Sequence, residues 1–368
     1  MKRLLVTVDS TTTDLTKSKT NELTYPIKPD PINGALTFIA SGVYLVRMPM
    51  DLGLDHINIY LLEDVDGWYV VDTGLATQEV KTIWNKIVNE LLFELPIKGL
   101  ICTHFHYDHA SLAPWMMRKF NIPLYMSAGE YLWMRVLADS KTERVSSQLQ
   151  PFYLTHGVPQ DLIDNILSMV ESDPLSSIYP STYNRVREGD VFEIKGRKWQ
   201  VIMGEGHSPE HICLWSAEDD LLICGDQLLP EISSSVFVNE IEPNANPLKG
   251  WLASLEKLQA LPKNTLVLPS HGGVFLGLHQ RAKIIHSLHQ KRLAQLRDVL
   301  ETQGQCNLYQ LMRALFKREM NSMNSMLALG ETAAHVNYLL LDKKLKKQHS
   351  KDDGTIIYSL SCPSESNI

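Results

Sequence analysis

Four side chains that can bind a metal ion lie within six consecutive positions of this chain, directly after an apolar, strand-like run. The four are His104, His106, Asp108 and His109. Imidazole and carboxylate together suit zinc, iron or manganese. If the strand geometry continues through the run, His104 and His106 project to the same face, and Asp108 lies where the chain turns into a helix expected over 110–120. The spacing therefore predicts a metal-binding motif.

Three further candidate ligands each follow an apolar strand pattern and stand beside glycine or proline. They are His207 after residues 198–203, Asp226 after 221–224 and His271 after 265–268. An α/β protein carries its chemistry on loops at the edge of a rigid sheet, so we expect these side chains to meet the first four. The combined set of five histidines and two aspartates provides enough ligands for two metal ions.

With these motifs, residues 36–281 resemble the metallo-β-lactamase superfamily, in particular its glyoxalase II-like hydrolases. The first family motif is matched by Val70-Val71-Asp72-Thr73-Gly74, and the second by residues 104–109. The resemblance implies an α/β fold, the four-layer αββα sandwich. It also implies one metal held by His104, His106 and His207, and a second held by Asp108, His109 and His271. By the same resemblance, Asp226 bridges the two metals and Asp72 orients a ligand through a hydrogen bond.

Composition fits an enzyme with one large and one smaller domain. The chain has 368 residues, a formal net charge of −7 and five cysteines, with no Cys-x-x-Cys pair. Cys102, Cys213 and Cys224 lie in apolar strand patterns, which predicts buried free thiols in a reducing compartment. The N-terminal apolar stretch is too short for a signal peptide, and no apolar run is long enough to span a bilayer. These features favour a cytoplasmic protein without a membrane partner.

Three regions follow from the patterns. Residues 1–35 are expected to form an N-terminal arm, 36–280 the catalytic domain, and 281–368 a smaller C-terminal domain. Within the catalytic domain, residues 139–188 match no core motif. We interpret them as an insertion that builds a pocket wall, with a simple surface insertion as the alternative. His56 and His156 are candidate pocket residues.

Helical periodicity returns after residue 280. Amphipathic helices are expected over 284–300, 308–316 and 327–341, and two extended runs flank Asp352-Asp353-Gly354, a hairpin signal. Three helices and a hairpin describe a winged helix. The stretch resembles the winged-helix module that is appended to many β-lactamase-like hydrolases.

Charge is divided unevenly along the chain. Residues 281–354 hold thirteen Lys/Arg and seven Asp/Glu, a net of +6, which leaves −13 for the remainder. The densest basic cluster comprises Lys343, Lys344, Lys346 and Lys347. A basic lobe beside an acidic body suggests an anionic partner. The alternative is that these lysines form a solvated helix end.

The predicted chemistry is hydrolysis by a metal-bound hydroxide, because two bridged cations lower the pKa of water to roughly 7. Zinc is the expected metal, with iron or manganese as substitutes, and Asp108 could accept a proton as the intermediate collapses. The first interpretation is an ester, thioester or lactone hydrolase, glyoxalase II-like or acyl-CoA thioesterase-like. Its substrate would be a small molecule on an anionic carrier such as glutathione or coenzyme A.

Other functions remain open. The second interpretation is a metal-dependent endoribonuclease or phosphodiesterase, although the acidic catalytic body offers no basic path to the metals. A third is a winged-helix nucleic-acid-binding regulator with a vestigial metal site, against which the complete ligand set argues. A sulfur dioxygenase with one iron is a minor alternative. A true β-lactamase is disfavoured, because those enzymes are exported and lack the aspartate found here at Asp226. A homo-oligomer is compatible with the sequence.

Overall fold

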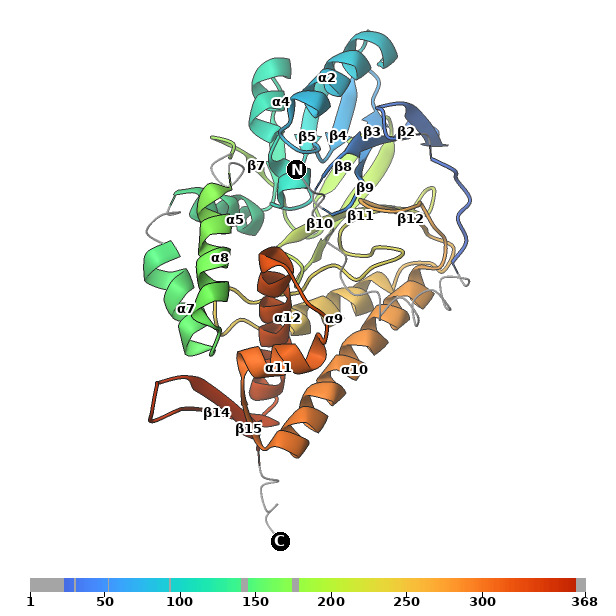
Figure 1. Ribbon diagram of the computed structural model, residues 1–368. Helices are drawn as coiled ribbons and strands as arrows, with labels where there is room; N and C mark the ends of the chain where they lie inside the picture. Colours follow the sequence, from blue (N-terminus) through green and yellow to red (C-terminus); the bar gives the residue numbers. More distant parts are fainter. Residues whose placement is uncertain are drawn as a thin grey trace. The chain divides into compact units, whose positions relative to one another are not determined.

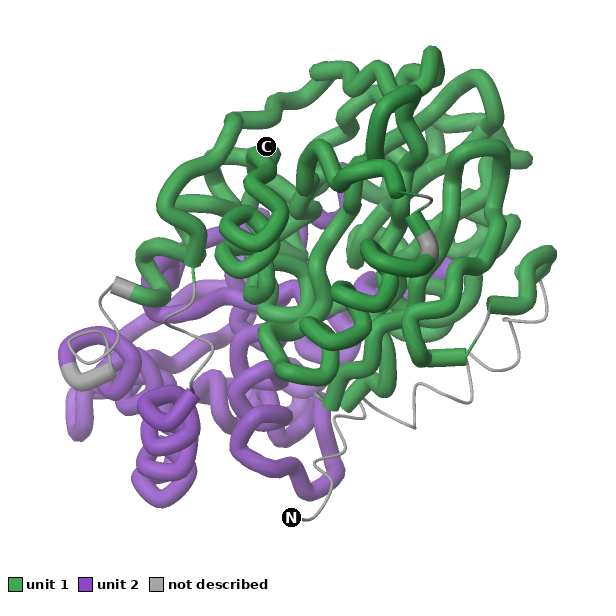
Figure 2. The backbone as a smooth tube through the Cα atoms, turned by 90° about the horizontal axis from the view of Figure 1, so that it is seen from above, with its two compact units in different colours: residues 1–139, 174–234, 254–283 green, residues 140–173, 235–253, 284–368 purple. Residues whose placement is uncertain are grey.

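The computed structural model describes residues 23–29, 31–51, 53–92, 94–139, 145–173 and 179–361. The chain divides into two compact units (Figure 2). The first unit comprises residues 1–139, 174–234 and 254–283, and the second comprises 140–173, 235–253 and 284–368. Most of the segment expected as an insertion is therefore grouped with the C-terminal residues. Among the described helices, none combines the length and apolar character that crossing a membrane requires.

Two β-sheets form the centre of the first unit. The larger has the strand order β1-β2-β3-β4-β5-β6-β7, and the smaller has the order β12-β11-β10-β9-β8. The strands of the larger sheet are β1 Leu36–Ala40, β2 Val43–Pro49, β3 His56–Glu63, β4 Trp68–Val71, β5 Ile97–Ile101, β6 Leu124–Met126 and β7 Asn184–Arg185. Those of the smaller sheet are β8 Val191–Ile194, β9 Arg197–Gly204, β10 His211–Ser216, β11 Leu221–Gly225 and β12 Leu266–Pro269.

Strand β3 shows why the apolar pattern produces stacked layers. Successive side chains of a strand point to opposite faces of the sheet. Ile57 and Ile59 are buried in a cluster with Trp84 of a covering helix, whereas Tyr60 is buried in a second cluster with Trp199 of the smaller sheet. Because β3 is buried on both faces, its sequence is a nearly continuous apolar run.

Helices cover the outer faces of the two sheets. The larger sheet is covered by α2 and α4, together with short neighbouring helices (Figure 1). On the smaller sheet, Lys257 of α9 donates a hydrogen bond to the carbonyl of Met203 in β9, at 2.8 Å. The layer order is that of the expected αββα sandwich. The helices within this unit are α2 Gln78–Lys86, η2 Ile87–Leu91, α3 Tyr107–Ala110, α4 Ala113–Phe120 and α5 Ala128–Asp139. Two further helices belong to it in part, namely α9 Pro247–Leu258, which ends in it, and α10 Leu278–Gln303, which begins in it.

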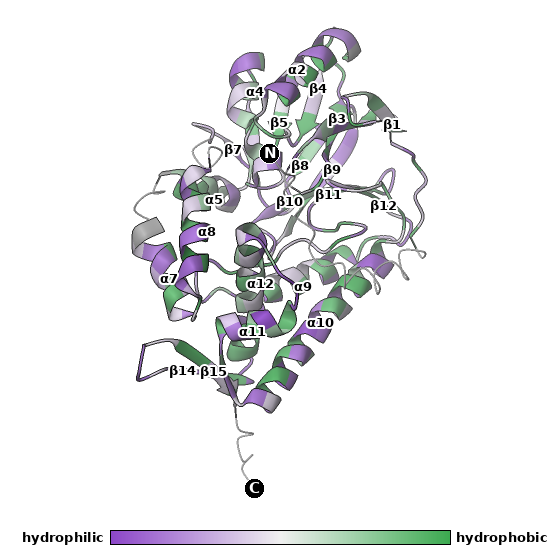
Figure 3. Cartoon of the chain, viewed as in Figure 1, coloured by the Kyte–Doolittle hydropathy of each residue, from purple (hydrophilic) through white to green (hydrophobic). Residues whose placement is uncertain are grey.

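The second unit is mainly helical. In α10, hydrophobic and hydrophilic residues alternate along the helix (Figure 3), and Leu293, Leu296 and Leu300 are buried at helical spacing. A three-stranded antiparallel sheet of order β13-β15-β14 includes the expected hairpin around Asp352-Asp353-Gly354. The remaining elements are η3 Val145–Leu149, α7 Gln150–Thr155, α8 Gln160–Ser172, β13 Gln305–Asn307, α11 Leu308–Leu315, α12 Ser322–Leu341, β14 Leu345–His349 and β15 Ile356–Leu360.

One local expectation needs correction. The helix expected over 110–120 is α4, and it begins later, at Ala113. Ala110 instead ends α3, and Pro114 near the start of α4 has no backbone N–H with which to continue the hydrogen-bond ladder from α3. Residues 36–49 form a hairpin of β1 and β2, which reverses at Gly42 with a φ of 71°. The predicted buried thiols Cys102, Cys213 and Cys224 are confirmed as free and buried.

The expected N-terminal arm is described only from residue 23. There Thr24 forms an antiparallel bridge with Leu276, with backbone hydrogen bonds of 3.2 and 2.8 Å, and the neighbouring Leu23 is buried. This end of the arm is thus attached to the first unit. Residues 1–22 lie outside the described part of the chain.

Candidate metal centre

The seven predicted ligands meet at one edge of the two sheets. Strands β9 and β11 both run antiparallel to β10, and β11 is parallel to β12. The C-terminal ends of these three strands therefore lie at the same edge, where His207, Asp226 and His271 follow them. Residues 104–109 follow β5 in the same way. This placement explains how ligands that are far apart in sequence form one site.

The expectation that His104 and His106 continue a strand is wrong. Strand β5 ends at Ile101, and His106 is the N-cap residue of α3. The reason is that the backbone N–H of Thr103 donates to the side chain of Asp72 at 2.7 Å, a side-chain partner in place of a strand neighbour. The two imidazoles nevertheless converge, because Nε2 of His104 and Nδ1 of His106 are 2.9 Å apart.

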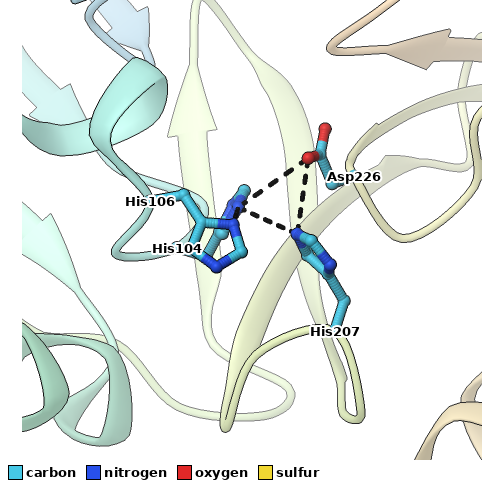
Figure 4. A group of neighbouring side chains, drawn as sticks. All are labelled: His104, His106, His207 and Asp226. Atoms are coloured by element: carbon cyan, nitrogen blue, oxygen red, sulfur yellow. Dashed lines mark hydrogen bonds and ion pairs between the residues drawn. The ribbon is translucent and has the colours of Figure 1, made fainter. Parts of the chain in front are cut away.

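The first cluster comprises His104, His106, His207 and Asp226, whose side chains point toward one another (Figure 4). The Nε2 atoms of His104 and His207 are 3.2 Å apart. Oδ2 of Asp226 lies 3.4 Å from Nε2 of His207 and 3.9 Å from Nε2 of His104. Three imidazole nitrogens and one carboxylate oxygen thus face a common point.

The second cluster comprises Asp108, His109 and His271, all of them buried. Oδ2 of Asp108 lies 3.3 Å from Nε2 of His109 and 3.2 Å from Nε2 of His271. The other carboxylate oxygen of Asp226, Oδ1, lies 3.6 Å from His109 and 3.4 Å from His271. Asp226 therefore presents one oxygen to each cluster, which is the arrangement of a bridging ligand.

Unpartnered atoms indicate that these residues fit a pair of cations. Among the described residues, Nε2 of His109 and Oδ1 of Asp226 are buried without a hydrogen-bond partner. Buried polar atoms are rarely left in this state, because burial without a partner costs roughly 1–3 kcal/mol. A divalent cation at each cluster would satisfy both atoms, and imidazole with carboxylate is a donor set that such metals accept.

Asp72, for which the family resemblance implied an orienting role, contacts a candidate ligand. Its Oδ2 lies 2.8 Å from Nδ1 of His109, while Oδ1 accepts the backbone N–H of Thr103. A proton on Nδ1 leaves the Nε2 lone pair of His109 facing the second cluster. Asp72 has a φ of 68°, a left-handed conformation that is uncommon outside glycine, and its own N–H donates to Ile101 at 2.9 Å.

His56, predicted as a pocket residue, lies beside a candidate ligand. Its backbone carbonyl accepts from Nδ1 of His271 at 2.9 Å, and its side chain pairs with Asp55 at 2.6 Å. The carbonyl thereby fixes the imidazole of His271 with Nε2 toward the second cluster. The other predicted pocket residue, His156, belongs to the second unit, where its Nδ1 donates to the carbonyl of Phe152 at 2.6 Å.

Two residues that support the site were not predicted. His211, on β10, accepts the backbone N–H of Asp226 at 3.1 Å and stacks on His104, with ring centroids 4.7 Å apart. A Cβ at Gly225 would lie 2.4 Å from the imidazole of His211, so glycine is required there. Burial lowers the pKa of His211 well below its usual value, which keeps the imidazole neutral and able to accept. In the sequence, the only local sign that His211 belongs to the site is its position shortly after His207 and Pro209.

The second unpredicted residue is Glu130, which is fully buried at the start of α5. Its Oε2 accepts the N–H of Phe105 at 3.0 Å, and its Oε1 accepts the N–H of Glu210 at 2.7 Å. Phe105 lies between two candidate ligands of the first cluster, and Glu210 lies three residues after His207. Glu130 thus ties the two ligand loops together. Burial raises its pKa to about 7, although the two N–H donors favour the anion.

The two carboxylates of the centre and the imidazole of His106 have the charges of metal ligands. Although burial opposes ionisation, His109 and His271 hold the pKa of Asp108 below its usual range, and His271 and His109 do the same for Asp226. Burial lowers the pKa of His106 to about 3, so this imidazole is neutral. Ionised carboxylates and neutral imidazoles are the forms that bind metals. By contrast, although burial favours the neutral imidazole, nearby carboxylates raise the pKa of His109 and His271, so a bound metal would displace a proton from each.

Fold and site together define the class of protein. Residues 52–271 match the model of the metallo-beta-lactamase superfamily, and residues 293–361 match that of a metallo-beta-lactamase-like C-terminal domain. The chain belongs to the metallo-β-lactamase superfamily, which confirms the resemblance seen in the motifs. Its relatives include the glyoxalase II-like hydroxyacylglutathione hydrolases.

Solved structures and curated relatives agree with this assignment. A β-lactamase domain protein from Burkholderia ambifaria is 35% identical, with a TM-score of 0.82, over 93% of this chain and 98% of its own. The probable metallo-hydrolase YqjP of Bacillus subtilis is 23% identical over 81% of this chain and 92% of its own length.

Two relatives carry more specific names. An atrochrysone carboxyl ACP thioesterase from Aspergillus fumigatus is 26% identical over 75% of this chain. The match covers about half, 54%, of the length of that thioesterase. A hydroxyacylglutathione hydrolase from Xylella fastidiosa is 28% identical over 40% of this chain and 62% of its own length.

Proposed function

We propose that this protein is a dinuclear metal-dependent hydrolase of thioesters or related esters and lactones. The observation that carries the proposal is the position of Asp226, whose two carboxylate oxygens face two separate clusters of ligands. A shared carboxylate makes the two cation sites one unit. Zinc is the expected metal, because three imidazoles in the first cluster suit it, and iron or manganese would be accepted by the same donors.

Different residues of the site would have different roles in hydrolysis. Bound cations would polarise a carbonyl oxygen as Lewis acids and lower the pKa of water to roughly 7. Asp72 and the carbonyl of His56 hold the imidazoles of His109 and His271 in one orientation. Asp108, which is ionised, is assigned a second role as the acceptor of a proton during turnover. No serine or cysteine nucleophile is required.

Thioesters are the preferred substrate class. Two relatives are named for thioester substrates, one with an acyl carrier protein and one with glutathione. The basic C-terminal stretch, with a net charge of +6 over residues 281–354, is suited to a small-molecule acyl group on an anionic carrier. We place the enzyme in the cytoplasm, where its buried free thiols would remain reduced.

A panel of substrates tests the proposal. The full chain is assayed for release of thiol from acyl-CoA and hydroxyacylglutathione, and for hydrolysis of p-nitrophenyl esters, homoserine lactones and single-stranded RNA. The assays are repeated after chelation and after reloading with zinc, iron or manganese. We expect thioester hydrolysis that is lost on chelation and restored by metal. Cleavage of RNA alone would establish the phosphodiesterase instead, and RNA binding without any hydrolysis would establish the regulator.

A further inference from the structure

A third group of metal-binding side chains lies in the second unit, outside the site described above. It comprises His289 on α10 with Glu331 and His335 on α12. One ligand atom from each residue lies within 4.8 Å of the others, and all three residues are buried. Glu331 and His335 are four positions apart, so they share one face of α12. The proposed hydrolysis does not use any of the three.

The two imidazoles approach each other as closely as those of the first cluster. Nδ1 of His289 lies 3.1 Å from Nε2 of His335, compared with 3.2 Å between the Nε2 atoms of His104 and His207. Nδ1 of His335 donates to the backbone carbonyl of Glu331 at 2.7 Å. This bond leaves the lone pair of His335 Nε2 facing His289, just as the carbonyl of His56 fixes His271.

Hydrogen bonds between protein groups do not complete this cluster. In the described part of the chain, Nε2 of His289 is buried without a hydrogen-bond partner. A single His–His hydrogen bond therefore leaves the pair incompletely satisfied.

Arg292 restricts which cation this cluster can accept. Its guanidinium pairs with Oε1 of Glu331, so it holds the carboxylate in place and offsets its charge. A hard cation such as calcium, which depends on several charged oxygens, would be disfavoured here. A metal that binds imidazole strongly, such as zinc, is less affected, because two of its three ligands are neutral nitrogens.

We propose that His289, Glu331 and His335 form a third metal site, of the zinc class, in the second unit. The site joins α10 to α12, since one ligand comes from the first helix and two from the second. Its role is structural: a metal that binds the folded unit and not the unfolded chain stabilises the fold. The inference does not depend on the substrate of the proposed hydrolase.

Metal content of the full chain tests the proposal. Zinc per chain is measured by mass spectrometry after loading and gel filtration, for the wild type, for His335→Gln and for the control His286→Gln, which lies on α10 with His289. We expect about three zinc ions in the wild type and control and about two in His335→Gln. A double variant, His104→Ala with His271→Ala, removes ligands from both catalytic clusters and should retain about one.

The double variant keeps the proposal testable if His335→Gln does not fold, because its second unit is unchanged. When the double variant is loaded with cobalt instead of zinc, it should show the visible absorption of a cobalt–imidazole complex. A triple variant that also carries His335→Gln should lack this absorption band. Retention of no metal by the double variant would overturn the third site and leave a buried hydrogen-bond network. Equal zinc content in folded His335→Gln and wild type would overturn it as well.

Discussion

Glu130 and Glu210 exchange hydrogen bonds between the start of α5 and the loop that carries His207. The carboxylate of Glu130 accepts the N–H of Glu210 at 2.7 Å, and the carboxylate of Glu210 accepts the N–H of Gly129 at 2.7 Å. Glu130 also accepts the N–H of Phe105, between His104 and His106. The two ligand loops of the first cluster are therefore held at a fixed separation by one buried carboxylate.

Replacing that carboxylate should weaken metal binding. In Glu130→Gln, one side-chain oxygen can still accept a backbone N–H, but the amide NH₂ faces the other donor. We expect metal affinity to fall about 10- to 100-fold, as is typical when a group that orients ligands is lost. Competition with a fluorescent chelator measures the affinity. Glu210→Gln is the matched control, because its side-chain oxygen can still accept from Gly129; an equal loss in both variants would contradict the assignment to Glu130.

The bridging position of Asp226 leads to a second prediction. Asp226→Asn removes the shared negative charge and one of the two ligand oxygens, so both cation sites should lose affinity and hydrolysis should fall by at least about 100-fold. Elemental analysis measures the metal content, and steady-state kinetics on the same preparation measure the rate of hydrolysis. One tightly held metal per chain, with unchanged content and activity in Asp226→Asn, would contradict the dinuclear assignment.

Asp72 should act through the tautomer of His109. In Asp72→Asn, the amide NH₂ can face Nδ1 of His109, which favours a proton on Nε2 and blocks the nitrogen that faces the second cluster. Asparagine tolerates the left-handed φ of 68°, so the backbone is retained. We expect the second cluster to lose about 10- to 100-fold in affinity while the first changes little. Two-step metal titration by calorimetry separates the sites; loss of both steps to the same extent would refute this role.

The proposed chemistry also predicts which residues are dispensable. Ser208 and Ser270 lie beside candidate ligands, yet neither is needed as a nucleophile. Ser208→Ala and Ser270→Ala should each keep turnover within about tenfold of the wild type, whereas chelation of the metals should abolish it. Quenched-flow mass spectrometry during turnover would detect an acyl-enzyme, and a trapped acyl group on either serine would defeat the proposal.

The basic cluster of Lys343, Lys344, Lys346 and Lys347 is exposed, and its members already have polar neighbours. Lys344 pairs with Asp342 at 2.5 Å, and Lys347 donates to Asn244 at 3.1 Å. If the cluster binds an anionic carrier, replacing all four by serine should raise KM several-fold for a charged thioester and leave neutral esters unchanged.

Salt dependence provides the control for this prediction. The effect on KM should shrink with added salt, because exposed charges are screened beyond about 8 Å at physiological ionic strength. Lys263→Ser, an exposed lysine of the first unit, should have no effect. The cluster is not the helix end considered as an alternative, because Lys346 and Lys347 lie on β14, after the turn that follows α12. If neither carrier kinetics nor RNA affinity changes in the fourfold variant, the cluster is a solvated surface of this turn and strand.

The candidate ligands were recognised from local sequence patterns, and the family resemblance that their motifs carry implied the fold class. Each candidate ligand follows an apolar strand, and strand ends at one sheet edge bring such residues together. The dipeptide Asp66-Gly67 likewise predicts a hairpin turn, and β3 and β4 pair around it. Helix ends were predicted less accurately: the helix expected over 110–120 begins at Ala113, although Pro114 is a local signal for that start.

Only the tertiary structure decided which residues far apart in the chain contact each other. Thr103 leaves the strand because its N–H is bound by Asp72, 31 positions earlier, and Glu130 reaches Glu210, 80 positions later. The pairing of His289 with His335 on two separate helices is of the same kind. Such contacts leave no periodic trace in the sequence, since each depends on two elements being packed first. The sequence therefore determined which residues are available as ligands, and the packing of the sheets and helices determined which atoms face each other.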